Sequence, residues 1–274
     1  MSNRRLAILG AGNIGRALIG GLLRSGTRPE HITVGEPIAA ARERLARDLG
    51  ITASPDNLAA VAGAAVVVLA VKPQDAAAVL APLARQWGAQ APLLISVAAG
   101  LRVATLRGWC GPKVAVVRAM PNRPALVGAA ATGLFAPPPV TAPQRAAAEQ
   151  VLKCVGEVVW VRTEDALDVV TALSGSGPAY FFLLAQLMAE AGERLGLEGP
   201  AARRLAAVTL YGAGLLAHSG DTDLARLRAE VASEGGTTEA ALRVLEDADL
   251  RATVARALEA AVLRARELAA SHQT

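Results

Sequence analysis

The chain has 274 residues, of which 53% are hydrophobic and 19% charged, so it is expected to be globular and long enough for two domains. Its net charge of +4 comes from basic residues spread along the chain, and aromatic residues make up only 3%. Nucleic-acid surfaces usually combine a basic stripe with aromatic side chains. We therefore predict no nucleic-acid partner.

No uninterrupted apolar run reaches the length of a membrane span, and the N-terminus leads into a glycine turn rather than a secretory signal. These features predict a cytoplasmic protein without membrane contact. Cys110 and Cys154 are then expected to be reduced thiols. Because His31, His218 and His272 are scattered, the sequence predicts no metal site.

Short β-rich runs alternate with helical patterns in the first half of the chain, which predicts an α/β fold with parallel strands joined by right-handed crossovers. Strands are expected at residues 6–9, 32–34, 65–71, 93–97, 114–118, 132–135 and 157–161. Helices are expected between them, at residues 39–49, 74–86 and 143–155.

The first expected strand runs directly into a glycine-rich turn at residues 10–15, and an apolar-periodic helical segment follows. This context is typical of a dinucleotide-binding fingerprint. Gly10 makes the tight turn, Gly12 lets the backbone approach a pyrophosphate, and Gly15 lets helix and strand pack closely. The pyrophosphate is then expected at the N-terminus of the helix.

Glu36 follows the second expected strand, about 20 residues after the last glycine of the fingerprint. A carboxylate there can accept hydrogen bonds from a ribose 2′-hydroxyl, whereas a 2′-phosphate would be repelled. The position therefore favours NADH over NADPH. Arg42 and Arg44 could instead turn toward a 2′-phosphate, so the cofactor is expected to be NADH or NADPH, with NADH weakly favoured.

Three later strands end in small or turn-forming residues, at positions 70–73, 96–100 and 120–122. Ligands of open parallel sheets bind at the carboxyl ends of the strands, so these turns are expected to line one crevice. The residues predicted to bind the cofactor are Gly10, Gly12, Asn13, Ile14, Gly15, Glu36, Ala70, Val71, Lys72, Pro73, Ala98, Ala99, Gly100 and Asn122.

Long helical patterns replace the strands after about residue 162, at positions 181–195, 201–217 and 250–268. We therefore predict a dinucleotide-binding domain at residues 1–163 and a helical domain at residues 164–274. Several of these helices are apolar on more than one face, which is typical of a helix that is central in its domain or buried by a partner chain.

The loop Ser233-Glu234-Gly235-Gly236-Thr237-Thr238 leads into another helical pattern. Its glycines let the backbone turn and expose N–H groups, and a helix start attracts an anion. Such a loop can hold a carboxylate and still leave a hydroxyl free for chemistry. The structural alternative is a helix cap in which Thr238 has no catalytic role.

Six motifs in this order make the sequence resemble the pyrroline-5-carboxylate reductase family, and the resemblance covers essentially the whole chain. They lie at residues 10–15, 70–73, 96–100, 118–122, 173–180 and 233–239. The resemblance implies an N-terminal Rossmann-type domain, an all-α dimerisation domain, and hydride transfer from NAD(P)H to a cyclic imine acid, the last step of proline biosynthesis. It also implies a homodimer, with a higher assembly of dimers left open.

The resemblance assigns the substrate site to the same loop. The carboxylate of the imine acid would lie on it, the Thr238 hydroxyl near the imine nitrogen as the catalytic group, and the Ser176 turn beside them. The residues implied to bind substrate are Ser233, Gly235, Gly236, Thr237, Thr238 and Ser176. It further implies that this loop serves the nucleotide domain of the partner chain.

Two positions depart from the family pattern. The family commonly reads Ser-Pro-Gly-Gly where this chain has Glu234 in place of proline, and Pro-Asn-Thr-Pro where it has Arg123 in place of threonine. Arg123 either offsets the charge of Glu234 or points to solvent.

Two other classes of protein compete with this interpretation. β-Hydroxyacid dehydrogenases also join a glycine-rich domain to a helical one, but they depend on a lysine in the helical domain, and the last lysine here is Lys153. A catalytically silent nucleotide-binding relative would keep the glycine turn and lose the substrate loop. This chain keeps Gly235, Gly236 and Thr238.

Overall fold

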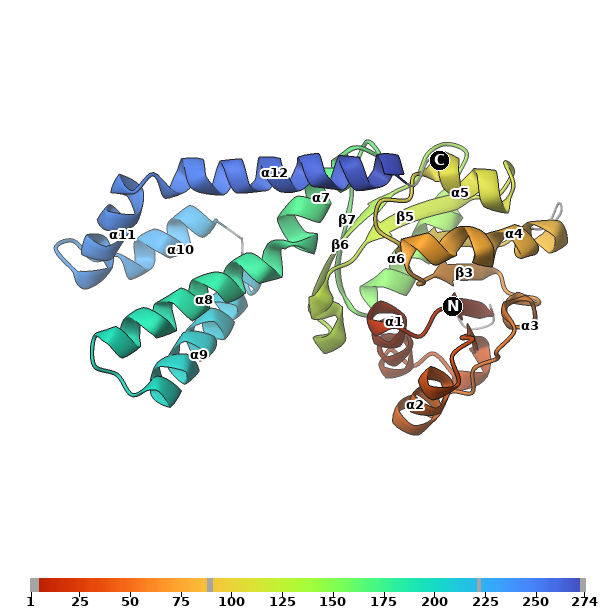
Figure 1. The fold of residues 1–274 in the computed structure, drawn as a ribbon, viewed down its shortest axis with the longest axis horizontal. Helices are drawn as coiled ribbons and strands as arrows, with labels where there is room; N and C mark the ends of the chain where they lie inside the picture. Colours follow the sequence, from red (N-terminus) through yellow and green to blue (C-terminus); the bar gives the residue numbers. More distant parts are fainter. Residues whose placement is uncertain (1–4, 88–90, 221–222, 272–274) are drawn as a thin grey trace. The chain divides into compact units, whose positions relative to one another are not determined.

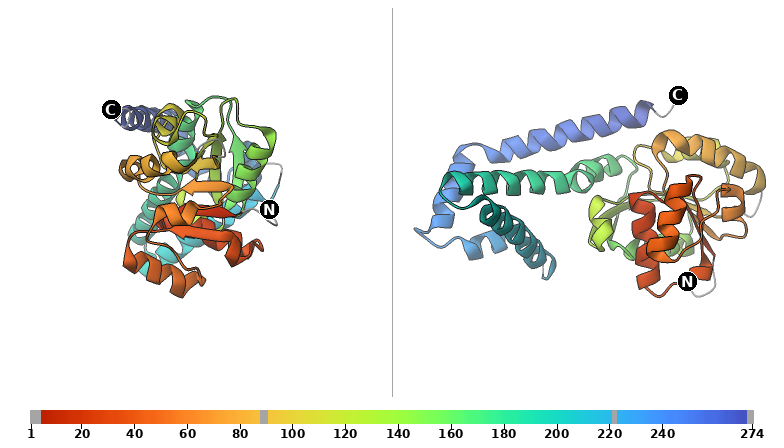
Figure 2. Two further views of the ribbon diagram at one scale, coloured as in Figure 1. Left: turned by 90° about the vertical axis from the view of Figure 1, so that its right-hand side faces the viewer. Right: turned by 60° about the horizontal axis from the view of Figure 1, so that its bottom comes forward.

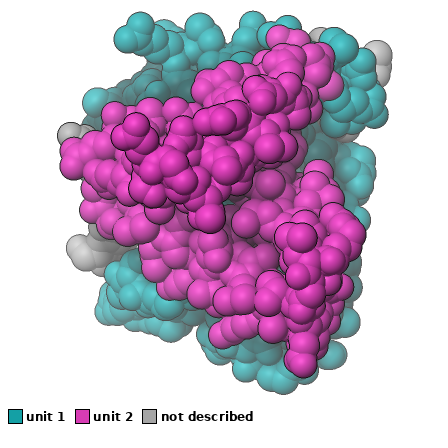
Figure 3. Space-filling view, turned by 90° about the vertical axis from the view of Figure 1, so that its left-hand side faces the viewer, with its two compact units in different colours: residues 1–176, 261–274 teal, residues 177–260 magenta. Residues whose placement is uncertain are grey.

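The structure is a computed structural model that describes residues 5–87, 91–220 and 223–271. The chain divides into two compact units, one formed by Met1–Ser176 with Ala261–Thr274 and the other by Gly177–Ala260 (Figure 3). The predicted domain boundary at residues 163 and 164 stays a prediction. In the structure, the residues from 164 to 176 and those from 261 onward pack with the first unit.

A seven-stranded sheet forms the centre of the first unit, in the order β2-β1-β3-β4-β5-β6-β7 (Figure 1). All seven predicted strands are present, and the ends of all but the first are shifted. Their bounds are β1 Leu6–Leu9, β2 Ile32–Gly35, β3 Val66–Leu69, β4 Leu93–Ser96, β5 Val116–Met120, β6 Ala130–Phe135 and β7 Gly156–Trp160. The chain passes from β2 across β1 to β3, so the sheet has a switch point between β1 and β3, where α/β proteins bind ligands.

The strands β1 to β5 pair in parallel, as the crossover helices predict, but β6 runs antiparallel to β5 and parallel to β7. The cause is the short connection from β5 to β6, which holds only the 3₁₀ helix η4, Arg123–Val127. A parallel return needs a crossover of a dozen or more residues.

Helices cover both faces of the sheet (Figure 2). Alternating strand residues face alternate cores: Leu6 and Ile8 pack with one set of helices, Ala7 and Leu9 with the other. The first core includes α1 Asn13–Arg24, α2 Ala39–Leu49 and α6 Ala142–Lys153. The second includes α3 Asn57–Val61, α4 Ala76–Trp87 and α5 Val103–Cys110.

The segment after β7 begins the helical part of the chain. Its elements are α7 Ala166–Val170, a single π turn η5 at Thr171–Gly175, and α8 Gly177–Arg194. The π turn thus ends within the Gly175-Ser176-Gly177-Pro178 sequence. By length and composition alone, the helical residues Ala166–Arg194 could cross a membrane, and 22% of their most apolar window is buried.

The second unit is helical in its described residues. It contains α8, α9 Gly199–His218, α10 Leu224–Val231, α11 Thr237–Asp247 and the first part of α12 Leu250–Ser271. Helices α8 and α9 pack against each other as a hairpin. The short helix α10 was not predicted from the sequence. Many large apolar side chains of this hairpin are exposed: Phe181, Phe182, Leu183, Leu184, Leu187, Met188, Leu205, Val208, Tyr211, Leu215 and Leu216.

Candidate active site

The three glycines of the turn between β1 and α1 differ in what a side chain would meet at each position. Gly10 has φ +99°, and a Cβ atom there would lie 2.7 Å from the Ala70 carbonyl oxygen. A Cβ atom on Gly15 would collide with the carbonyl oxygen of Gly10. By contrast, no atom lies within 4 Å of the corresponding position on Gly12. The turn is thus closed on the protein side and open at the one glycine where a pyrophosphate is expected.

The N-terminus of α1 is also suited to an anion. Its N-cap residue is Gly12, whose lack of a side chain leaves the first N–H groups uncapped, and no acidic residue occupies the first turn. Asn13 is exposed and Ile14 is half-buried at this end. The five predicted residues of the turn, Gly10, Gly12, Asn13, Ile14 and Gly15, thus lie at a helix end that favours negative charge.

Glu36 is buried, with 6% of its surface exposed, and its carboxylate braces the glycine turn. One oxygen accepts a hydrogen bond from the Ala11 N–H at 2.8 Å, and the other accepts from the Ile38 N–H at 3.0 Å. A carboxylate has about four acceptor positions, so two N–H donors leave room for a ribose hydroxyl. The sequence indicated Glu36 but not its contact with the turn.

The two arginines that could meet a 2′-phosphate differ in their surroundings. The Arg42 guanidinium donates to the carbonyl oxygens of Glu36 and Pro37, at 2.9 and 2.8 Å, so it is already engaged. Arg44 is exposed on the same helix.

The end of β3 lies beside the glycine turn, and the end of β4 lies beside that of β3. The Ala70 N–H donates to Leu9 at 2.8 Å, and the Val97 N–H donates to Leu69 at 3.0 Å. Val71 packs beside Gly10, while Lys72 is exposed and Pro73 begins the 3₁₀ helix η2, Pro73–Asp75. After β4, Ala98 is buried, Ala99 is exposed and Gly100 has φ +77°. Since β1, β3 and β4 are parallel neighbours, these residues share one edge of the sheet.

Asn122 lies at the end of β5, but its side chain is used within the fold. Its amide nitrogen donates to the Ser174 carbonyl oxygen, and its amide oxygen accepts from the Ala131 N–H, both at 3.0 Å. The residue thereby connects β5 and β6 to the π turn. A contact between Asn122 and cofactor stays a prediction.

The π turn packs closely against the end of β5. A Cβ atom on Gly175 would lie 2.7 Å from the terminal methyl carbon of Met120. Single π turns occur often at functional sites because they offset the residues that follow them. Ser176, predicted to line the substrate pocket, is half-buried directly after this turn.

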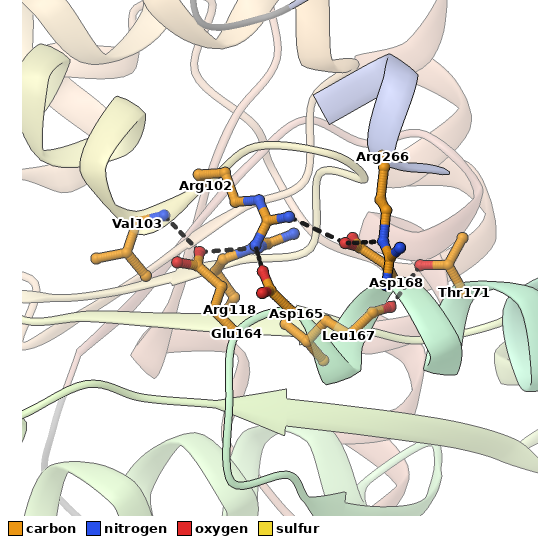
Figure 4. Close-up of polar contacts among 9 residues, drawn as sticks. All are labelled: Arg102, Val103, Arg118, Glu164, Asp165, Leu167, Asp168, Thr171 and Arg266. Carbon is orange, nitrogen blue, oxygen red and sulfur yellow. Dashed lines mark hydrogen bonds and ion pairs between the residues drawn. The ribbon is translucent and has the colours of Figure 1, made fainter. Parts of the chain in front are cut away.

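A cluster of ion pairs holds the chain just beyond the Ala98–Gly100 turn (Figure 4). Arg118, a buried arginine within β5, pairs with Glu164 at 2.8 Å. The same Glu164 oxygen accepts the Val103 N–H at 2.7 Å, at the start of α5. Burial lowers the pKa of Arg118, and the hydrogen bond and charge of Glu164 oppose that effect. Glu164 therefore fixes a strand and a helix start at once.

The second half of this cluster is centred on Arg102. Its guanidinium donates to Asp168 at 2.9 Å and pairs with Asp165, and Arg266 of α12 lies 4.0 Å from Asp168. Burial disfavours the charged form of Arg102, but the hydrogen bond with Asp165 and the surrounding acids outweigh it and raise its pKa. The sequence did not predict this network. The signal that could have indicated it is Arg118, a charged residue within the otherwise apolar strand β5.

The predicted substrate loop forms a tight turn before α11. The Gly236 N–H donates to the Ser233 carbonyl oxygen at 3.0 Å, and Gly235 between them has φ +68°. The N-cap of α11 is Gly236, so Thr237 and Thr238 are its first two helical residues. Thr238 is therefore not the N-cap residue of α11.

The two cysteines are buried or partly buried thiols that are not activated. Cys110 and Cys154 are free thiols, and burial raises their pKa values to about 11 and about 12, so both are protonated at neutral pH. No three His, Cys, Asp or Glu side chains in the described part of the chain are grouped to hold a metal ion.

Comparison with known proteins identifies the family of the chain. A family model for pyrroline-5-carboxylate reductase dimerisation matches residues 164–268, and one for the NADP oxidoreductase, coenzyme F420-dependent, matches residues 5–100. A pyrroline-5-carboxylate reductase from Pseudomonas aeruginosa is 45% identical over 269 residues, covering 98% of both chains. The chain belongs to the pyrroline-5-carboxylate reductase family.

Solved structures extend this result to the fold. The pyrroline-5-carboxylate reductase from Coxiella burnetii has a TM-score of 0.93 at 39% identity, over 97% of this chain and 98% of the other. The enzyme from Plasmodium falciparum, solved with NADP bound, has a TM-score of 0.83 at 26% identity over 98% and 99%. The Rossmann-type domain followed by a helical dimerisation domain is confirmed.

Membership of the family defines the class of reaction. These enzymes are NAD(P)H-dependent oxidoreductases that reduce the cyclic imine of 1-pyrroline-5-carboxylate, the last step of proline biosynthesis. The β-hydroxyacid dehydrogenase and silent-relative interpretations are thereby set aside.

Proposed function

We propose that this protein reduces 1-pyrroline-5-carboxylate to L-proline, with NAD(P)H held at the glycine turn and the substrate held by the loop Ser233–Thr238. The observation that carries the proposal is the turn itself. Neighbouring backbone atoms leave no room for a side chain at Gly10 or Gly15, whereas Gly12 faces open space at the switch point of the sheet. This is the arrangement that a bound pyrophosphate requires.

The residues at this edge fit a dinucleotide. The N-terminus of α1 would hold the pyrophosphate, Glu36 the adenosine ribose, and the turns at Ala70–Pro73 and Ala98–Gly100 the remainder, with Asn122 at the next strand end. The Glu36 carboxylate keeps acceptor positions free beside Ala11, which supports a ribose contact. When bound, the cofactor supplies the hydride.

The substrate loop is proposed to hold the carboxylate of the imine acid. The N-terminus of α11 carries N–H groups and the positive end of the helix dipole, and Thr237 lies at its first position. Ser233, Gly235 and Gly236 shape the turn before it. Ser176, directly after the π turn, is also proposed to contact the substrate.

Thr238 is proposed as the catalytic residue. Its hydroxyl lies in the first turn of α11 and is not used as the N-cap. In the proposed site it contacts the imine nitrogen while the imine carbon is reduced. A protonated imine already accepts hydride well, so the site needs orientation and a polar contact more than a strong acid. This accounts for chemistry without a catalytic histidine.

Glu36 supports a preference for NADH over NADPH. Its buried carboxylate would lie close to a 2′-phosphate, and Arg42, the nearest cation on α2, is held by two carbonyl oxygens. Burial of a charge next to a like charge is unfavourable. The NADP in the Plasmodium falciparum structure belongs to that protein, and a cofactor comparison on this chain tests the preference directly.

The assembly is proposed to be a homodimer formed through the helical domain, with a higher assembly of dimers open. The exposed apolar surface of α8 and α9 supports this, because such a surface is typical of an obligate interface. The same surface explains why Ala166–Arg194 has the composition of a membrane span. We propose a cytoplasmic location, no membrane contact and no nucleic-acid partner. Dimer formation is measured by sedimentation, where a folded, active monomer would contradict it.

The resemblance further suggests that the loop of one subunit completes the site of the other. Mixing an inactive Gly12 variant with an inactive Thr238 variant should then restore part of the activity after subunit exchange. No recovery despite demonstrated exchange would contradict a shared site.

The reaction itself is tested by following cofactor absorbance when the purified protein is mixed with 1-pyrroline-5-carboxylate and NADH or NADPH. We expect substrate-dependent oxidation of the cofactor and formation of L-proline. A folded protein that binds the cofactor but shows no substrate-dependent oxidation would contradict the proposal.

A further inference from the structure

The substrate loop contains the turn Ser233–Gly236, whose second residue does not restrict the backbone. Gly236 donates to Ser233 across the turn, and Gly235, its third residue, has φ +68°. A turn with a left-handed third residue is usually stabilised by proline at the second position, because proline fixes φ near −65°. That position is Glu234, which carries no such constraint.

A carboxylate from the following helix supplies the missing constraint. Glu239, the third residue of α11, accepts a hydrogen bond from the Gly235 N–H at 2.6 Å. Its other oxygen lies 3.3 Å from the Arg243 guanidinium, one helical turn further on. Arg243 thus helps to hold the Glu239 side chain, and Glu239 in turn holds the glycine that bends the loop.

We propose that Glu239 is a positioning residue for the reaction, which fixes the Ser233–Gly236 turn so that the loop is ready to receive the substrate carboxylate. This inference rests on the proposed function, in which that loop binds the substrate. Glu239 acts through Gly235 and does not contact the reacting atoms. Its effect should therefore appear in substrate binding and leave the chemical step unchanged.

In the alternative role, Glu239 would inhibit substrate binding, because it would occupy the Gly235 N–H group that the substrate needs. The geometry favours positioning. The Gly235 N–H lies within the turn, whereas Thr237 and Thr238 lie in the first helical turn, whose N–H groups have no intrahelical acceptor. The two roles predict opposite changes in the KM for 1-pyrroline-5-carboxylate, so one measurement separates them.

The test compares Glu239→Ala, Glu239→Gln and the double variant Glu234→Pro/Glu239→Ala with the wild type. We expect Glu239→Ala to raise the KM for 1-pyrroline-5-carboxylate about three- to tenfold, the range of one lost hydrogen bond, with kcat and the KM for NADH unchanged. Glu239→Gln should stay near the wild type, because its amide oxygen can accept the Gly235 N–H. Glu234→Pro should lower the raised KM of Glu239→Ala, because proline restricts the unfolded turn.

Glu230→Ala is the matched control. Glu230 forms the same kind of exposed pair, with Arg226 one turn away at 2.8 Å, and among the described residues it makes no hydrogen bond or ion pair with the loop. Its kinetic constants should match the wild type. An unchanged or lowered KM in Glu239→Ala, at unchanged melting temperature, would overturn the inference. A Thr238→Ala enzyme with normal kcat would instead count against the proposed function, so the two failures are distinguishable.

Discussion

The carboxylate of Glu36 accepts a hydrogen bond from the Ala11 N–H at 2.8 Å, which links the proposed ribose-binding acid to the centre of the glycine turn. One side chain thus contacts the turn proposed to hold the pyrophosphate and is also proposed to bind the ribose at the position where NADH and NADPH differ. Its substitution is expected to affect both properties, and the choice of replacement separates them.

Glu36→Gln should narrow the ratio of kcat/KM for NADH over NADPH by on the order of tenfold. The amide removes the negative charge but keeps an oxygen that can accept the Ala11 N–H, so the turn should stay formed. Glu36→Ser removes both contacts and should narrow the ratio while weakening binding of both cofactors. A wild-type enzyme that clearly prefers NADPH would refute the assigned role of Glu36.

Thr238→Ala should lower kcat about ten- to a hundredfold and leave cofactor affinity nearly intact. A hydrogen bond to a charged group contributes roughly 1.5–3 kcal/mol, and a tenfold change in rate corresponds to about 1.4 kcal/mol. Thr237→Ala should have a smaller effect if Thr237 contributes only its backbone N–H. Because Gly236 is the N-cap, neither change should lower the melting temperature much. Unchanged kcat in Thr238→Ala would return this loop to a structural role.

Two substitutions in the glycine turn should have opposite effects on stability and on cofactor binding. Gly15→Ala should lower the melting temperature, because its Cβ atom would collide with the Gly10 carbonyl oxygen, and overpacking typically costs about 1–3 kcal/mol. Gly12→Ala should fold with near-normal stability, because its Cβ atom would meet open space, yet raise the KM for NADH. Thermal unfolding and cofactor kinetics on both proteins check this. Normal cofactor binding by Gly12→Ala would argue against a pyrophosphate at that glycine.

Glu164→Ala should destabilise the protein strongly, because it leaves the buried Arg118 guanidinium and the Val103 N–H without their shared acceptor. Removing one partner of a buried pair typically costs about 3–5 kcal/mol, which corresponds to a fall in melting temperature of roughly 5–15 °C. Asp165→Asn is the matched control, since the Asp165 side chain is 74% exposed and such pairs contribute about 1 kcal/mol or less. Equal melting temperatures of the two variants, at equal protein concentration, would contradict this.

The strands and the glycine turn could be predicted from sequence because local signals define them. A continuous apolar run such as Val66–Leu69 and a fixed glycine spacing are visible in a few consecutive residues. The Glu239 contact also had a local signal, a glutamate three residues after the N-cap of a helix.

Long-range pairing could not be predicted in this way. Arg118 and Glu164 are far apart in sequence and meet only because β5 and the segment after β7 converge. The contact of Glu36 with the Ala11 N–H and the use of Asn122 to hold the π turn have the same origin. The antiparallel pairing of β6 follows from a connection too short for a crossover, a constraint that residue patterns did not reveal.

The central claim is that this chain transfers a hydride from a reduced nicotinamide to the imine carbon of 1-pyrroline-5-carboxylate. NADH carrying deuterium at both C4 positions tests it most directly, with the product analysed by mass spectrometry. The account predicts L-proline with one deuterium at C5, and a strong loss of that product in Thr238→Ala. Unlabelled proline, or no proline from a folded protein that binds NADH, would contradict it.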